Sequence, residues 1–171
     1  ALGHVPMVGR NPKSAGRIGE PPAIVAQPAH GTLSGTGADR TYTPAANYSG
    51  PDSFTFKATY GAASSAEATV SILVTPVNDA PSAQADAATT FKNTAVNVNV
   101  LANDVDVDGD QLLVASTTSP ANGTVTVTGG GAVINYRPRN GFTGIDSFTY
   151  TVSDGHGGLS TATVTVNVTR K

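Results

Sequence analysis

The residues best suited to chemistry lie in one short acidic loop. Four aspartates alternate there with other residues: Asp104, Asp106, Asp108 and Asp110. In an extended stretch their carboxylates would point the same way, about 6 to 7 Å apart, and neighbours would repel by roughly 0.6 kcal/mol in bulk water. A bound hard cation such as Ca²⁺ turns this repulsion into net attraction, because it takes carboxylate oxygens as ligands. The spacing therefore predicts a calcium site, and the alternative is a solvated acidic turn opened by Gly109.

An EF-hand and a histidine-based site fit the sequence less well than this calcium site. The loop begins like an EF-hand, but its twelfth position is Ala115, where a bidentate glutamate is required. No motif places a nucleophile or a second metal ligand beside the histidines, which are His4, His30 and His156. We therefore expect a binding or structural protein and not an enzyme.

An internal repeat organises the chain around this loop. Residues 135–150 match residues 41–56 without a gap, so that Tyr136 pairs with Tyr42 and Asp146 with Asp52. Such self-similarity predicts two copies of one structural unit. Asp52 and Asp146 precede matching strands, and we expect their carboxylates to accept hydrogen bonds from nearby backbone N–H groups.

The second copy has the pattern of a β-sandwich. Apolar and polar residues alternate over 95–101 and 160–168, which predicts strands with one buried face. Turn signals such as Asn122-Gly123 separate further expected strands, which lie near 89–91, 111–117, 124–128, 132–137 and 147–152. Seven short strands at this spacing predict an all-β, Greek-key sandwich of the immunoglobulin type.

The first copy is expected to be N-terminally incomplete. Its recognisable strands start only near residue 23, and nothing before them matches the two leading strands or the acidic loop. We therefore expect four parts: an irregular or disordered segment (1–20), an incomplete repeat (21–76), a proline-bounded linker (77–81) and a complete repeat (82–171). The first segment is expected to be either a disordered tail or a source of irregular substitutes for the missing strands. A sandwich short of strands exposes part of its core, so the first repeat should be the less stable one.

The composition excludes several classes of protein. The absence of cysteine rules out a disulfide framework and any cysteine-based metal site. A net charge of -2 argues against nucleic acid as a partner, because such binding needs a basic stripe. No apolar run approaches the roughly 18 residues of a membrane span, so membrane insertion is not expected.

Three stretches of the chain are informative together: residues 77–81 (VNDAP), 101–110 (LANDVDVDGD) and 144–155 (GIDSFTYTVSDG). In this order they resemble the bacterial cadherin-like tandem repeats of secreted and surface-anchored adhesins. The resemblance covers residues 23–169. It implies two tandem cadherin-like sandwiches of the immunoglobulin type, an extracellular or cell-surface location, and calcium at the joints between repeats.

The resemblance also implies ligands. In cadherins they come from the Asn-Asp pair of the linker, an Asp-x-Asp loop after the second strand and an Asp after the sixth strand. Together with the acidic loop, this gives the candidate metal ligands Asn78, Asp79, Asp104, Asp106, Asp108, Asp110 and Asp154. Tyr60 stands at the position of Asp154 in the first copy, so we expect no equivalent site there.

These features predict a calcium-stiffened extracellular spacer or adhesion module. Its expected partners are neighbouring repeats of the same chain, and also a cell-surface protein or polysaccharide. One alternative is a carbohydrate-binding module of a secreted hydrolase. Its sugar platform would consist of Tyr42, Tyr48, Tyr136 and Phe142, and binding would be lost when Tyr48 or Phe142 is changed. Another is a fibre subunit in which the short first repeat accepts a strand from a neighbouring chain.

Overall fold

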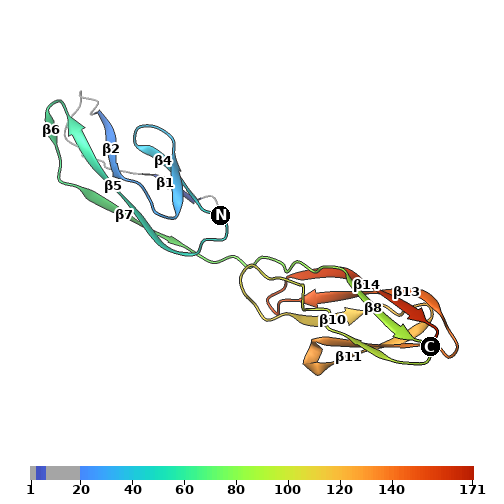
Figure 1. The fold of residues 1–171 in the computed structure, drawn as a ribbon. Helices are drawn as coiled ribbons and strands as arrows, with labels where there is room; N and C mark the ends of the chain where they lie inside the picture. The colour runs from blue at the N-terminus through green and yellow to red at the C-terminus, as the bar shows by residue number, and fades with distance from the viewer. Residues whose placement is uncertain (1–2, 7–19) are drawn as a thin grey trace. The chain divides into compact units, whose positions relative to one another are not determined.

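The protein is described by a computed structural model that covers residues 3–6 and 20–171 (Figure 1). It divides into two compact units, Ala1–Val77 and Asn78–Lys171. The division falls inside the predicted linker, residues 77–81. Within the described residues no helix is long and apolar enough to cross a membrane.

The first unit consists of short strands in two sheets. Its strands are β1 (Gly3–Pro6), β2 (Glu20–Ala26), β3 (Gly31–Ser34), β4 (Asp39–Pro44), β5 (Gly50–Tyr60), β6 (Ala63–Ser64) and β7 (Ala68–Val74). One sheet has the order β1-β4-β3, and the other is built on β5, which pairs with β2, β6 and β7. All these pairings are antiparallel.

The start of the chain differs from the irregular segment predicted for residues 1–20. Gly3–Pro6 forms β1 and pairs with β4, with Gly3 opposite Tyr42. In the second unit β9 pairs with β12 in the same way, with Val96 opposite Tyr136. β1 therefore takes the place of β9, as in the alternative that this segment supplies substitutes for the leading strands. Most of the predicted segment, residues 1–2 and 7–19, lies outside the described residues.

The second unit has the seven strands that the alternation predicts. They are β8 (Asp86–Phe91), β9 (Val96–Val98), β10 (Leu113–Thr117), β11 (Gly123–Thr128), β12 (Val133–Pro138), β13 (Gly144–Ser153) and β14 (Leu159–Thr169). One sheet has the order β10-β13-β14-β8 and the other β11-β12-β9. Only the β14–β8 pairing is parallel. In the described part of the first unit, β7 pairs with β5 and has no parallel partner like β8.

The core of the second unit explains why these strands pack as two layers. Val164, Val166 and Val168 are buried on one side of β14, and Thr and Asn alternate with them on the other. They join Tyr150 and Phe148 of β13 in one cluster of buried side chains. In the first unit, among residues whose side chains are described, the large buried apolar residues are Tyr42 and Phe54. Among the described side chains, the first unit thus has the smaller core.

A buried tyrosine–aspartate pair is repeated in both units. The hydroxyl of Tyr42 donates to Asp52 Oδ2 at 2.8 Å, and that of Tyr136 donates to Asp146 Oδ2 at 2.8 Å. Both carboxylates also accept backbone N–H groups, for example from Ala29 at 2.9 Å. This confirms the structural role expected for the two aspartates, which leaves them outside any metal site.

Candidate metal centre

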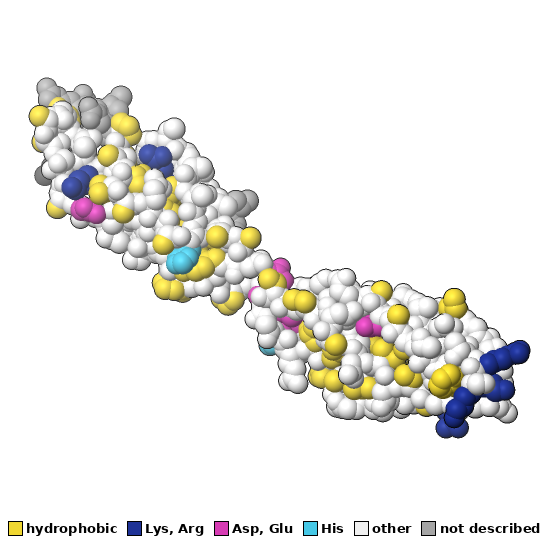
Figure 2. Space-filling view, viewed as in Figure 1, with side chains coloured by type: hydrophobic (Ala, Val, Ile, Leu, Met, Phe, Trp, Pro, Cys, Tyr) yellow, Lys and Arg dark blue, Asp and Glu magenta, His cyan; other side chains and the backbone are white. Residues whose placement is uncertain are grey.

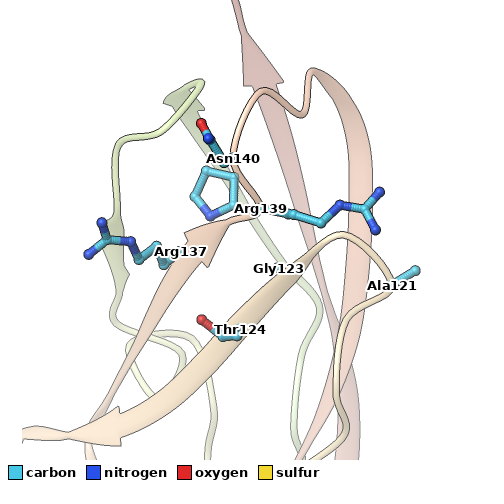
Figure 3. Close-up of a pocket in the computed structure, with 7 residues that line it drawn as sticks. Ala121, Gly123, Thr124, Arg137, Arg139 and Asn140 are labelled. Carbon is cyan, nitrogen blue, oxygen red and sulfur yellow. The ribbon is translucent and has the colours of Figure 1, made fainter.

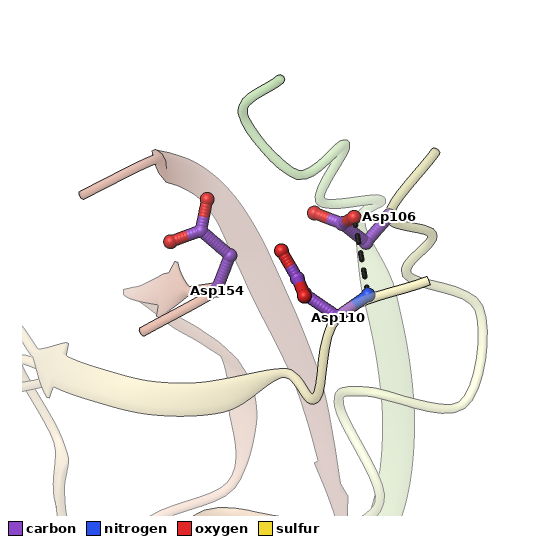
Figure 4. A group of neighbouring side chains, drawn as sticks. All are labelled: Asp106, Asp110 and Asp154. Atoms are coloured by element: carbon purple, nitrogen blue, oxygen red, sulfur yellow. Dashed lines mark hydrogen bonds between the residues drawn. The ribbon is translucent and has the colours of Figure 1, made fainter. Parts of the chain in front are cut away.

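Three of the predicted ligands come together at one end of the second unit. Asp106 and Asp110 lie in the loop between β9 and β10, and Asp154 directly follows β13. Each offers a carboxylate oxygen within 4.8 Å of the other two. Figure 4 shows the three side chains around one small space. Residues from two loops far apart in the sequence therefore present oxygen ligands to a common point.

The acidic loop is a tight turn and not the extended stretch that the spacing suggested. Asp106 Oδ1 accepts the backbone N–H of Asp108 at 2.9 Å and that of Asp110 at 3.3 Å. Gly109 permits the turn with a φ of +81°. Asp106 Oδ2 is buried and has no hydrogen-bond partner. A buried carboxylate oxygen without a donor is the kind of atom that a cation would satisfy.

Asp154 is held firmly by its own hairpin and by the start of the unit. Its Oδ1 accepts the N–H groups of His156 at 2.7 Å and Gly158 at 3.0 Å. Its Oδ2 accepts the amide of Asn78 at 2.8 Å. The hydrogen bond from Asn78 lowers the pKa of Asp154, although burial opposes this, so the carboxylate is ionised at neutral pH.

Gly158 is a supporting residue that the sequence reasoning missed. A Cβ atom there would collide with the Asp154 carboxylate and would lie 2.8 Å from the backbone of Ala80. Only glycine allows this close approach, so residue 158 helps to fix both the carboxylate and the chain after Asn78.

The other predicted ligands have different places. The backbone N–H of Asp79 donates to Asp108 Oδ2 at 2.7 Å, so these two residues bind each other. Asp104 accepts the N–H of Gln84 at 2.7 Å and the hydroxyl of Tyr150 at 3.0 Å. Asn78 contacts the cluster only indirectly, through the hydrogen bond that its side-chain amide donates to Asp154. The structure therefore separates the four alternating aspartates, which the spacing had grouped together.

Asp86 lies near Asp104, and the sequence did not indicate that these two acidic residues are neighbours. Burial raises the pKa of Asp86, and the nearby charge of Asp104 adds to this. Asp86 Oδ2 is buried without a hydrogen-bond partner. Asp86 opens β8, and its place in an alternating strand gave no signal of an acidic neighbour.

The electrostatics of the centre favour a bound cation. Carboxylates at this separation repel by roughly 1 kcal/mol per pair in bulk water, and by several times more at lower dielectric. Among the described residues the one ion pair is His156 Nε2 with Asp110 Oδ1 at 3.5 Å, which requires a protonated histidine. The donors are all oxygens, which is the ligand type that Ca²⁺ prefers.

The described part of the first unit contains no such group of carboxylates. Tyr60 stands at the position of Asp154 in the repeat. Among the described residues, the acidic cluster therefore belongs to the second copy.

Comparisons with known proteins agree with this fold. The search of curated proteins found no match to this sequence. The human mucin-like protocadherin EC1-2 structure is 18% identical over 90% of this chain and 85% of its own, with a TM-score of 0.53. The protocadherin GammaB4 extracellular domain is 16% identical over 86% of this chain and 26% of its own, with a TM-score of 0.50. An endo-fucoidan hydrolase of glycoside hydrolase family 107 is 25% identical over 90% of this chain, with a TM-score of 0.40, and the chain spans 24% of its length.

The family assignment rests on a match to both units. The family model of the bacterial Ig domain matches residues 13–73 and 78–167, which is most of the chain. The protocadherin ectodomains share the fold of tandem β-sandwiches. The predicted all-β architecture and the cadherin-like resemblance are both confirmed. The chain belongs to the bacterial Ig domain family, of which it carries two consecutive copies.

Proposed function

We propose that this chain is a calcium-binding spacer of an extracellular bacterial protein. Its second unit would hold Ca²⁺ through Asp106, Asp110 and Asp154. The observation that carries the proposal is the approach of their oxygens to within 4.8 Å of one another, with the buried Oδ2 of Asp106 left without a donor. Membership of the bacterial Ig domain family supports a non-catalytic module that works beside neighbouring repeats of the same chain.

The surrounding contacts connect this centre to the first residues of the second unit. A bound calcium ion would supply the positive charge that removes the repulsion between the carboxylates. Asn78 already donates to Asp154, and the N–H of Asp79 donates to the acidic loop through Asp108. Ordering that loop and Asp154 would therefore also order residues 78–79. We propose that the stiffness of the linker depends on calcium for this reason, as the resemblance to cadherin-like repeats implies.

Calcium titration of the full chain by calorimetry tests the binding step. We expect Asp106→Asn and Asp154→Asn to weaken binding by about tenfold or more, because each removes a charged ligand. Asp39→Asn is the matched control, since Asp39 is an exposed aspartate of the first unit, and it should bind like the unchanged protein. Equal affinity in all four proteins would place the ion elsewhere.

Small-angle scattering tests the stiffening step separately. The maximum dimension of the unchanged chain should differ between chelator and millimolar calcium, whereas that of Asp106→Asn should not. Binding without any change in scattering would keep the calcium site but reject the role in stiffening.

The aromatic residues of the carbohydrate-binding alternative do not form an exposed platform. Tyr42 and Tyr136 are 3% and 0% exposed, and their hydroxyls bind the buried aspartates. Tyr48 is stacked on His30 with a centroid distance of 4.2 Å, so one face of its ring is covered. Phe142 packs against the core. These contacts argue against a sugar-binding platform built from these four aromatic residues.

A further inference from the structure

The cationic residues of the second unit gather at the end away from the metal centre. They are Lys92, Arg137, Arg139, Arg170 and Lys171. Asp154 precedes β14 and Arg170 follows it, so about 35 Å of strand separates the two charges. Lys92 is tied to that far end through its N–H, which donates to Thr169 at 2.9 Å. Figure 2 shows the Lys and Arg side chains on this end of the unit.

A shallow depression of about 350 Å³ lies among these charges. Arg137 and Arg139 line it together with Thr124 and Asn140. The two arginine side chains point to opposite sides (Figure 3). Arg139 is steadied by donating to Asn122 Oδ1 at 3.0 Å. Among the described residues neither arginine forms an ion pair, so both charges are available to a ligand.

The fold does not need these arginines. In the matching stretch of the first copy, Thr43 and Ala45 stand at the positions of Arg137 and Arg139. That copy builds the same antiparallel pairing, β3 with β4, as β11 with β12. The charges are therefore an addition to a hairpin that forms without them.

We propose that this depression binds an acidic polysaccharide, with Arg137 and Arg139 each holding a carboxylate or sulfate group. Guanidinium groups bind such oxyanions through paired, charge-assisted hydrogen bonds. Because the two side chains diverge, they suit anionic groups spaced along a polymer better than a single small anion. Thr124 and Asn140 supply neutral polar groups for sugar hydroxyls.

The lining argues against an acidic protein as the ligand. Its apolar side chains are Ala121 and Pro138, and it contains no aromatic residue. Protein interfaces usually depend on large apolar or aromatic anchors that fill pockets. A polyhydroxylated, negatively charged chain fits this surface better.

Binding of the full chain to immobilised polymers tests the proposal. Polygalacturonate and dextran sulfate present carboxylates and sulfates, while neutral dextran and polyglutamate serve as controls. All measurements are made with a chelator present, so that the result does not depend on the proposed calcium site. We expect at least one acidic polysaccharide to bind, and added salt to weaken the binding. The polymer that binds identifies the anionic group.

A double variant locates the binding site. R137T/R139A installs the residues of the first copy and should weaken binding by about tenfold or more. Arg170→Ala removes one charge from the same end but outside the depression, and should change affinity by less than about twofold. The first copy indicates that the double variant folds, and amide spectra would verify it. Failure of both acidic polysaccharides to bind, an equal loss in Arg170→Ala, or equally strong binding of polyglutamate would each overturn the proposal.

Discussion

Replacement of Asp52 by asparagine should remove a large part of the acid sensitivity of the first unit. Asp52 is 7% exposed. Burial alone would raise the pKa of its carboxyl group, but hydrogen bonds from Tyr42 and from three backbone N–H groups lower it to about 2. The charged form is therefore the one that the folded unit stabilises.

The size of the effect follows from this change in pKa. Lowering the pKa from 3.8 to about 2 in the folded state corresponds to about 2.5 kcal/mol of unfolding free energy near neutral pH. Because the folded pKa lies below the unfolded one, this stabilisation is complete above the ordinary pKa. It is lost as the pH falls through 3.8 towards 2. About 1 kcal/mol of it should be gone by about pH 3.

Urea unfolding of the full chain, followed by amide resonances of each unit, measures this loss. The first unit of the unchanged protein should lose about 1 kcal/mol more between about pH 7 and pH 3 than the first unit of Asp52→Asn. Asp39→Asn, an exposed aspartate in the same unit, is the control and should behave like the unchanged protein. Identical acid dependence in Asp52→Asn and the unchanged protein would refute the reasoning.

Three further predictions concern packing and the metal centre. In the same urea titration the first unit should unfold before the second, because its described core has fewer large buried side chains; simultaneous loss of both sets of resonances would contradict this. Gly123→Ala should destabilise the second unit by about 1 to 3 kcal/mol, because its Cβ would lie 2.5 Å from the Tyr136 ring; an unchanged midpoint would show that the ring can move. Gly158→Ala should weaken calcium binding by about tenfold, because the added methyl group displaces the Asp154 carboxylate. If calorimetry finds an unchanged affinity, Asp154 is not a calcium ligand.

The sequence predicted the strands well because their signal is local. Alternation of buried and exposed residues is visible along β14, and the matching tyrosine and aspartate residues reveal the second copy. β1 was missed because its four residues have no alternation, and their strand structure depends on pairing with β4, far away in the sequence. Local patterns carry no information on such pairing.

The cluster of Asp106, Asp110 and Asp154 was predicted only in part for a similar reason. Residue type and spacing identified the acidic loop, and the resemblance added Asp154 and Asn78. Spacing alone could not show that the loop turns around Asp106 Oδ1, which sends Asp104 towards Tyr150 and Asp108 towards Asp79. The direction of each carboxylate depends on these backbone contacts, which only the folded chain reveals.

Calcium titration of the isotope-labelled full chain, followed residue by residue by amide resonances, tests the central claim most directly. We expect saturable changes confined to the second unit, at Asp106, Asp110 and Asp154 and at the connected residues Asn78 and Asp79, with no response around Tyr60. Absence of saturable changes at millimolar calcium, or changes located away from these residues, would contradict the account.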